Sequence, residues 1–211
     1  MEESMKRRIV LFDFDGVIAD SKALAYEVNK MICPHLTEED FRKRFEGNIN
    51  DWQEPNHTSE CRLDIDFFAL YAPKLKEKTA VVPGMDEVIA KLADSHILIV
   101  VSSTITSPIQ EFLNMHELSR YFREIMGSDV HSSKVEKIKM VFSKYTAEPA
   151  DCVFITDTLG DMREAEKTEV GSIGVLWGFH DKDRLLRGNP FSIVEKPENL
   201  VSAAQNYFRK N

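Results

Sequence analysis

The sequence predicts an α/β protein: a Rossmann-like, mostly parallel sheet flanked by helices, with a helical cap domain inserted after the first strand. Short and almost continuously apolar runs recur along the chain, as expected of strands covered on both faces. Segments with helical periodicity lie between these runs, which is typical of βαβ units. Residues 17–82 break this alternation, which indicates an insertion.

The predicted strands are apolar throughout rather than alternately apolar and polar. A strand with one face in water would alternate, so the pattern favours a buried parallel sheet. The runs are Ile9–Phe12, Ile97–Val101, Cys152–Ile155, Ser172–Leu176 and a later one at Phe191–Val194.

Apolar residues at helical spacing predict the helices that connect these strands. Ser107 and Pro108 resemble an N-cap followed by a proline in the first turn. The predicted helices of the core cover 85–92, 107–113, 135–145 and 200–208.

Residues 17–82 contain no clear strand and are rich in charged and aromatic side chains. The segments 24–32 and 64–75 predict helices, and 46–59 is polar and turn-prone. A Pro-Gly pair at 83–84 precedes the return of the alternating pattern. The predicted domains are a core made of 1–16 and 83–211, and a cap made of 17–82.

Composition and charge exclude several classes of protein. The chain has 211 residues and a net charge of −8, whereas a surface that follows nucleic-acid phosphates needs clustered lysine and arginine. No apolar stretch approaches the roughly 20 residues of a membrane span, and the charged N-terminus does not resemble a signal peptide. We therefore expect a cytoplasmic protein that binds neither nucleic acid nor membrane. The sequence does not indicate an oligomeric state.

The three cysteines, Cys33, Cys61 and Cys152, show no C-x-x-C spacing. A sparse, odd set is more typical of a reduced cytosolic protein than of a disulfide framework. No paired soft ligands lie near them in the sequence, which argues against a metal site.

Two carboxylates, Asp13 and Asp15, directly follow the first predicted strand, and Gly16 allows the chain to turn there. Ligands of an open parallel sheet bind outside the carboxyl ends of its strands. Residues two apart on an extended chain point the same way, so both acids can face one site. Close carboxylates repel unless a cation relieves them, which favours a hard ion such as Mg²⁺. A turn with solvated acids is the alternative.

Other polar residues follow the second and third predicted strands. Ser102 and Ser103 follow the second, where a hydroxyl and helix-terminal N–H groups suit a phosphate oxygen. Asp157 and Asp161 follow the third, and Lys134 begins a predicted helix. Each of these residues also has an ordinary explanation when it is considered alone. The serines could cap a helix, Asp161 could be an acid in the first turn of a helix, and Lys134 could be a solvated lysine.

The order of these elements resembles the haloacid dehalogenase superfamily of phosphohydrolases. The matching stretches are DFDGVIADS, VPGMDEVIAKL, VVSS and ITDTLGDMREAEKTEVGSIGVLWGF. The chain looks most like the phosphoglycolate-phosphatase-like branch, which has a helical cap after the first motif. The resemblance is strong in 7–21 and 81–180 and weak in 22–80. One departure is Thr156, where many relatives have glycine and where a β-branched residue could crowd the metal loop.

The resemblance implies a Mg²⁺-dependent phosphatase that hydrolyses a small phosphorylated metabolite through an aspartyl-phosphate intermediate. Asp13 resembles the nucleophile, and Asp15 resembles the general acid and base. The other implied roles are metal binding by Asp13, Asp15, Asp157 and Asp161, and phosphate binding by Ser102, Ser103, Lys134 and Gly16.

Other branches of the superfamily fit less well. Enzymes that attack carbon, and phosphonatases, lack the acid that this chain has at Asp15. Phosphosugar mutases carry a cap histidine where this chain has Ala25. A mutase, and a non-catalytic protein that binds phosphate or another protein, remain the two alternatives.

The segment 41–52 is the candidate specificity loop of the cap. Its Arg44 is suited to a second anionic group of the substrate, and Asn48 and Trp52 to an organic portion. An ordinary solvated helix face followed by a loop is the alternative.

Overall fold

A computed structural model describes residues 8–52, 60–62 and 64–210. The strands of these ranges are β1 (Ile9–Phe12), β2 (Ile97–Val101), β3 (Phe122–Met126), β4 (Cys152–Thr156), β5 (Gly171–Val175) and β6 (Ser192–Val194). They form one sheet in the order β3-β2-β1-β4-β5-β6, and all neighbouring strands are parallel. The predicted α/β fold is confirmed.

The register of the three central strands sets the position of the site. Phe12, the last residue of β1, lies opposite Val100 of β2 and Ile155 of β4. The carboxyl ends of the three strands therefore lie at nearly the same level. The strand order reverses between β1 and β4, and open α/β sheets bind ligands in the crevice at such a point.

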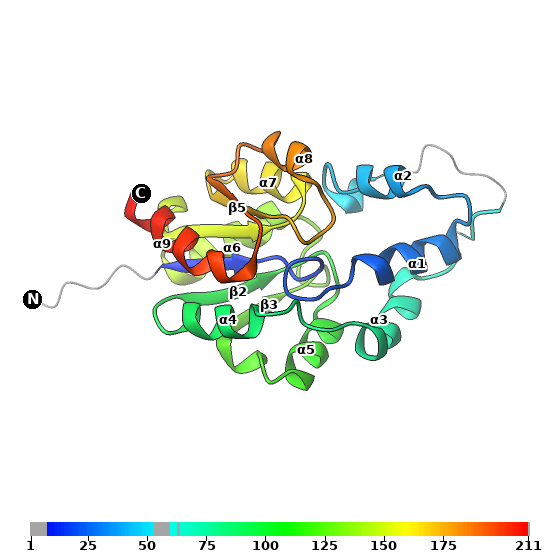
Figure 1. The fold of residues 1–211 in the computed structure, drawn as a ribbon, viewed down its shortest axis with the longest axis horizontal. Coiled ribbons are helices and arrows are strands. Elements are labelled where there is room, and N and C mark those ends of the chain that lie inside the picture. Colours follow the sequence, from blue (N-terminus) through cyan, green and yellow to red (C-terminus); the bar gives the residue numbers. More distant parts are fainter. Residues whose placement is uncertain (1–7, 53–59, 63, 211) are drawn as a thin grey trace, which may run out of the picture.

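Helices cover both faces of the sheet (Figure 1). They are α1 (Lys22–Ile32), α2 (Glu38–Lys43), α3 (Phe67–Lys78), α4 (Met85–Ala93), α5 (Thr106–Met115), α6 (Lys134–Tyr145), α7 (Leu159–Glu166), α8 (Lys182–Leu186) and α9 (Leu200–Lys210), with 3-10 turns η1 (Ile49–Asp51), η2 (Ser119–Tyr121), η3 (Pro149–Asp151) and η4 (Pro197–Asn199). None of these helices is both long enough and apolar enough to cross a membrane, within the described residues.

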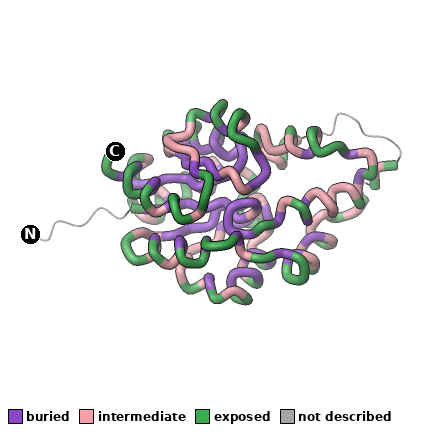
Figure 2. Tube along the Cα trace, in the orientation of Figure 1, coloured by how far each residue is buried: buried purple, intermediate pink, exposed green. Residues whose placement is uncertain are grey.

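The sheet is buried on both faces, which explains its continuous apolar runs. Val10 and Phe12 belong to a hydrophobic cluster with residues of α4, α5 and α9, whereas Ile9 and Leu11 pack in a second cluster with residues of α6 and α7. Figure 2 shows the buried residues concentrated along the strands, between the two helical layers.

Three helices, α1, α2 and α3, lie beyond the carboxyl ends of the strands and come between β1 and α4 in the chain (Figure 1). Helices α1 and α3 pack against each other. Gly84, with a φ of +85°, is the residue from which α4 begins as the chain returns to the core. The domain boundaries around 17–82 stay a prediction. The charged N-terminus (1–7) and half of the predicted polar loop (53–59) lie outside the described residues.

Two local features differ from the sequence predictions. Strand β3 was not among the predicted strands, because Arg123 and Glu124 interrupt its apolar residues, which an edge strand tolerates. Helix α5 begins at Thr106, so Ser107 lies inside the helix and is not its N-cap. The side chain of Asp129 accepts hydrogen bonds from the backbone N–H and the hydroxyl of Thr106, both at 2.7 Å. A residue outside the helix therefore provides the partner for the first backbone N–H of α5.

The expectation of three reduced cysteines is wrong for two of them. Cys33 and Cys61 form a disulfide, with their Cα atoms 4.3 Å apart, while Cys152 is free and buried. The paired cysteines are 28 residues apart in the chain. They meet because the segment before α3 returns to the end of α1, and their spacing in the sequence does not show this.

Candidate active site

The buried centre of the site is a lysine between two carboxylates. The Nζ atom of Lys134 lies 3.0 Å from Oδ1 of Asp13 and 2.6 Å from Oδ2 of Asp161. Asp13 follows β1, Asp161 lies in the first turn of α7 after β4, and Lys134 begins α6. The three side chains are at most 10% exposed. The structure thus brings together residues from three separate parts of the chain.

Asp13 is held by the backbone at the end of β1. Its N–H donates to the carbonyl of Ile155 at 2.9 Å, which extends the pairing of β1 with β4 by one step. Its Oδ1 accepts the N–H of Phe14 at 2.8 Å. Burial raises the pKa of Asp13 well above its usual range, although Lys134 opposes that shift. A cation bound beside Asp13 would favour its ionised form.

Lys134 is not the solvated lysine of the alternative explanation, because only 2% of its side chain is exposed. Burial disfavours its charged form, but the carboxylates of Asp13 and Asp161 outweigh burial and raise its pKa. Its backbone N–H donates to Oε1 of Glu164 at 3.0 Å, which ties the start of α6 to α7. The ammonium group is therefore a fixed positive charge.

A family model described as haloacid dehalogenase-like hydrolase matches residues 10–175. The chain belongs to this family. The resemblance recognised from the sequence motifs is confirmed.

Relatives and solved structures agree with this haloacid dehalogenase-like assignment. Phosphoglycolate phosphatase of Synechococcus elongatus is 20% identical over 209 residues, which cover 95% of this chain and 99% of that protein. Pyrophosphatase PpaX of Listeria monocytogenes is 23% identical over 211 residues, covering 93% and 96% of the two chains. The crystal structure of a predicted phosphatase from Clostridium acetobutylicum is similar in fold, with a TM-score of 0.78, 22% identity, and coverage of 95% of this chain and 99% of that one.

The carboxylates of this haloacid dehalogenase-like hydrolase fit a divalent cation. Oδ1 of Asp157 is buried and has no hydrogen-bond partner among the described residues, while its Oδ2 accepts the N–H of Phe179 at 2.6 Å. Burial raises the pKa of Asp157 to about 7, with a further contribution from Asp161. A bare buried carboxylate oxygen is costly without a partner, and Mg²⁺ prefers such oxygen ligands.

Thr156, the departure from the family pattern, holds Asp161 in place. Its hydroxyl donates to Oδ2 of Asp161 at 2.7 Å, on the same oxygen that Lys134 approaches. Burial opposes the ionised form of Asp161, but the charge of Lys134 and the hydrogen bonds with Lys134, Asp13 and Thr156 together lower its pKa. Instead of crowding the loop, the β-branched side chain supplies an additional donor to the carboxylate.

Asp15 is held by three hydroxyl groups. Ser21 donates to Oδ1 at 2.8 Å, Thr104 donates to Oδ2 at 2.7 Å, and the hydroxyl of Tyr71 also bonds Oδ1. Tyr71 comes from α3 of the inserted segment, so the predicted cap contributes directly to the environment of this acid. Neither Tyr71 nor its role is visible in a short motif, because it lies far from Asp15 in the chain.

The predicted phosphate-binding residues separate into two groups. Ser102 and Ser103 line the same cavity as Lys134. Gly16 does not line that cavity; it packs against Asp157, and a Cβ atom on it would lie 2.2 Å from Oδ2 of that residue. Its φ of +75° is a second reason why glycine is suited to this turn.

Lys137 is a buried lysine that was not among the predicted site residues. Its ammonium donates to the carbonyl of Ser102 at 2.6 Å and to that of Gly127 at 3.3 Å. It therefore joins the ends of β2 and β3 beneath the Ser102 loop. Burial, with the nearby charge of Lys134, lowers the pKa of Lys137 to about 8. In the sequence, only its position about one helical turn after Lys134 indicates that Lys137 could lie near the site.

A cavity of about 280 Å³ opens above these groups. Of the three predicted specificity residues, Arg44 and Trp52 line it, whereas Asn48 does not. Asn48 instead caps η1 by accepting the N–H of Asn50 at 2.9 Å. The inserted segment also contributes residues that were not among the predicted site residues, including Asn29, Phe45, Phe67, Phe68 and Tyr71.

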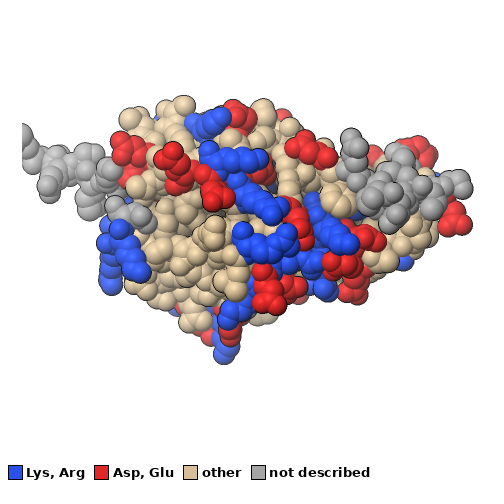
Figure 3. Space-filling view, turned by 90° about the horizontal axis from the view of Figure 1, so that it is seen from above, with Lys and Arg blue, Asp and Glu red and all other residues tan. Residues whose placement is uncertain are grey.

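The loop between α2 and η1 is docked on the core. The N–H of Gly160 donates to the carbonyl of Phe45 at 2.8 Å, and the amide of Asn50 donates to the carbonyl of Ser132 at 2.8 Å. Glu46 pairs with Arg184 at 3.1 Å and with Arg187 at 2.9 Å. Figure 3 shows basic and acidic side chains interspersed across one face of the molecule. This docking covers the cavity from the side of the inserted segment.

Proposed function

We propose that this chain is a Mg²⁺-dependent phosphatase that hydrolyses a small phosphomonoester through an aspartyl-phosphate formed on Asp13. The observation that carries the proposal is the arrangement at the cavity floor. A buried carboxylate, Asp13, lies beside the fixed charge of Lys134. Asp157, close enough to contribute to the pKa of Asp13, has an oxygen that finds no hydrogen-bond partner among the described residues and can bind a cation.

The relatives support this class of reaction. They include proteins named phosphoglycolate phosphatase and pyrophosphatase. A phosphoric monoester hydrolase, the enzyme class expected from the sequence, agrees with these names. The cytoplasmic location and the absence of nucleic-acid and membrane partners stay predictions.

The chain's own residues divide the chemistry between them. Asp13 attacks phosphorus, and Asp15 donates a proton to the leaving oxygen and then takes one from the attacking water. Ser102, Ser103 and Lys134 bind and neutralise the phosphoryl oxygens. Bound Mg²⁺ would supply additional positive charge for the phosphoryl group and the nucleophile.

The residues that would hold Mg²⁺ are carboxylates and one carbonyl. They are the side chains of Asp13 and Asp157 and the backbone oxygen of Asp15, with Asp161 as a ligand or a support. The raised pKa values of Asp13 and Asp157 fit this assignment, because a nearby cation would favour their ionised forms.

The cavity favours a small substrate. Its volume of about 280 Å³ suits a metabolite better than a polymer. Arg44 lines the cavity and contacts the side-chain oxygen of Asn29, so a substrate with a second anionic group would meet a guanidinium there. Aromatic side chains, among them Phe45, Phe67 and Phe68, supply much of the remaining wall.

A phosphosugar mutase is disfavoured by one feature of the cavity. Ala25, which stands where the superfamily's mutases carry a cap histidine, lines the cavity and offers no acid or base. A non-catalytic binding protein is the second alternative, and turnover distinguishes it from a phosphatase.

The test is hydrolysis of p-nitrophenyl phosphate with and without Mg²⁺, followed by a panel of metabolite phosphates. We expect Mg²⁺-dependent turnover, which Asp13→Asn reduces by at least about 1,000-fold. Asp86→Asn, an exposed aspartate in α4, is the matched control and should retain full activity. Folded protein that turns over no phosphomonoester would refute the proposal and favour a binding role.

A further inference from the structure

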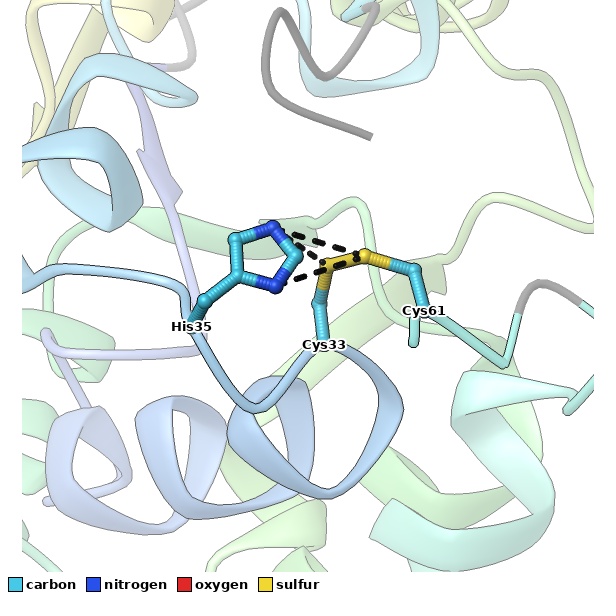
Figure 4. Close-up of side chains that lie close together, drawn as sticks. All are labelled: Cys33, His35 and Cys61. Carbon is cyan, nitrogen blue, oxygen red and sulfur yellow. Dashed lines mark hydrogen bonds between the residues drawn. A yellow bond between two sulfur atoms is a disulfide. The ribbon is translucent and has the colours of Figure 1, made fainter. Parts of the chain in front are cut away.

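A second cluster of reactive side chains lies in the inserted segment, outside the cavity. Figure 4 shows Cys33, His35 and Cys61 with the imidazole ring against the two sulfurs. Nε2 of His35 lies 3.6 Å from Sγ of Cys33 and 3.7 Å from Sγ of Cys61. None of the three residues lines the cavity or contributes to the chemistry proposed above.

The chain builds this cluster at the end of a helix. Cys33 is the C-cap of α1, and Pro34 follows it. The N–H of Leu36 donates to the carbonyl of Cys33 at 3.0 Å, so the chain turns and places His35 beside the cap. The N–H of Arg62 donates to the carbonyl of Ile32 at 2.8 Å, which brings the neighbouring Cys61 to the same point. The backbone positions all three side chains.

The geometry suits a tetrahedral metal ion bound by two thiolates and an imidazole. In such a zinc site, bond lengths of about 2.3 Å to sulfur and 2.0–2.1 Å to nitrogen place each sulfur about 3.6 Å from the nitrogen. Both observed sulfur-to-Nε2 distances are close to this value. After reduction, the two sulfurs must separate to about 3.8 Å to bind the ion. Rotation of the two side chains is enough for this, because the Cα atoms are already only 4.3 Å apart.

We propose that Cys33, Cys61 and His35 form a redox-controlled zinc site, in which the reduced pair binds Zn²⁺ together with His35. The three ligand atoms lie within 4.8 Å of one another, and a water molecule completes the four positions. The spacing of the cysteines in the sequence argued against a metal role, because no paired soft ligands lie near them. The fold supplies the pair.

Oxidation of the pair releases the ion. A small-molecule disulfide accepts the two electrons: its sulfur–sulfur bond breaks, the Cys33–Cys61 bond forms, and two small-molecule thiolates leave and take up protons from water. Disulfide sulfurs carry no negative charge, so the cation loses two of its three protein ligands. The structure shows the oxidised pair.

The cluster also closes a segment that reaches the substrate cavity. The cysteines are 28 residues apart in the chain, and the segment between them includes α2 and the cavity-lining residues Arg44 and Trp52. Either a disulfide or a zinc bridge would constrain this segment, whereas reduced thiols without metal would leave it held only by its docking contacts. The site therefore couples thiol redox state and zinc to the wall of the cavity.

The test uses the full chain, reduced and freed of reductant under argon, titrated with Co²⁺ as a spectroscopic substitute for Zn²⁺. We expect a thiolate-to-cobalt charge-transfer band that saturates at one ion per chain and disappears when Zn²⁺ is added. Carboxylate ligands of the active site give no such band, so failure of the proposed phosphatase function would not affect this readout. Adding oxidised glutathione should abolish the band as the intramolecular disulfide forms.

Variants identify the ligands. Cys33→Ser and Cys61→Ser should each lose the band, and His35→Ala should weaken Co²⁺ binding by about 100-fold or more. Cys152→Ala removes the remaining, buried thiol and should leave the band unchanged. The proposal is overturned if the reduced wild-type chain shows no band, if the band persists without His35 at unchanged affinity, or if it requires Cys152.

Discussion

Lys134 is a buried cation whose two neutralising partners are both candidate catalytic groups. Removing one member of a buried ion pair leaves an unmatched charge and usually destabilises a protein by about 3–5 kcal/mol. Replacing all three charged side chains with well-packed apolar residues is often neutral or stabilising, so stability alone does not explain why the charged cluster is used. Binding an anionic phosphoryl group does explain it, because the ammonium then has a third partner in the bound state.

At the same scale, the structure predicts a positioning role for Tyr71. Its hydroxyl bonds Asp15, so Tyr71→Phe should misorient this proposed general acid and lower kcat by about 10–100-fold with an alkyl phosphate. The loss should be smaller with p-nitrophenyl phosphate, because nitrophenolate leaves without a proton. Steady-state kinetics with both substrates measures this difference.

Tyr26→Phe is the matched control for that variant. The hydroxyl of Tyr26 donates to the carbonyl of Leu36 at 3.2 Å, and Tyr26 does not line the cavity. Its loss should leave kcat unchanged for both substrates. Equal rate losses of Tyr71→Phe on the two substrates would contradict a role through the general acid.

The hydroxyl of Thr156 is a second single group whose removal should have a measurable effect. Thr156→Val keeps the shape of the side chain but removes the donor to Asp161, so this carboxylate, which we propose supports the metal, would be less well oriented. We expect the Mg²⁺ concentration for half-maximal activity to rise by about 10-fold. Thr156→Ser retains the hydroxyl and should behave as wild type; an unchanged Mg²⁺ requirement in the valine variant would exclude this role.

At the scale of elements, the Cys33–Cys61 disulfide joins two parts of the inserted segment, and other residues of the segment dock on the core. Phe45, Glu46 and Asn50 contact the core through backbone carbonyls, an ion-pair cluster and a side-chain amide. Ion pairs on a surface contribute little individually. The guanidinium groups of Arg187 and Arg184 nevertheless lower the pKa of Glu46, although burial opposes this shift.

The disulfide should stabilise this element by restricting the unfolded chain. For cysteines 28 residues apart, the loop-entropy relation gives about 3.5 kcal/mol. Urea unfolding in the presence of a chelator should therefore show the oxidised protein to be more stable than the reduced one by about this amount. In Cys33→Ser the two conditions should coincide. A stability that does not depend on redox state in the wild-type chain would show that the pair does not form in solution.

At the scale of the whole molecule, a buried histidine joins the inserted segment to the core. Nδ1 of His180 accepts the N–H of Leu159 at 3.0 Å, so the proton lies on Nε2, which donates to the carbonyl of Arg42 at 2.9 Å. Burial lowers the pKa of His180, and Arg184 contributes in the same direction, while the carbonyl of Arg42, Glu46 and Asp181 oppose the shift.

The lowered pKa makes stability depend on pH. Between the folded pKa and the ordinary value of 6.5, the unfolded chain binds more protons, so stability rises with pH. The contribution of His180 is complete above about pH 6.5 and is lost as pH falls through the folded pKa. Urea unfolding as a function of pH should show this decline, and His180→Gln should reduce its slope. Equal slopes in the two proteins would show that His180 does not carry the effect.

The fold was predictable because buried parallel strands leave a distinct pattern. Every predicted strand corresponds to an observed one within one or two residues, whereas the edge strand Phe122–Met126 was missed. Its interrupting charges, Arg123 and Glu124, are tolerated at an edge and erase the pattern that identifies a central strand. Each predicted helix corresponds to an observed one, but the helix ends were not predictable, since Asp129 caps Thr106 from a distant loop.

By itself, the sequence determined the parallel α/β fold and the strand ends that carry acids and hydroxyls, because apolar runs and the residues after them are local properties. Only the tertiary structure decided which side chains meet. It placed Tyr71 on Asp15, Lys137 beneath Ser102 and Cys33 against Cys61. Contacts between residues far apart in the chain depend on how helices pack across the sheet, and no short stretch of sequence contains that information.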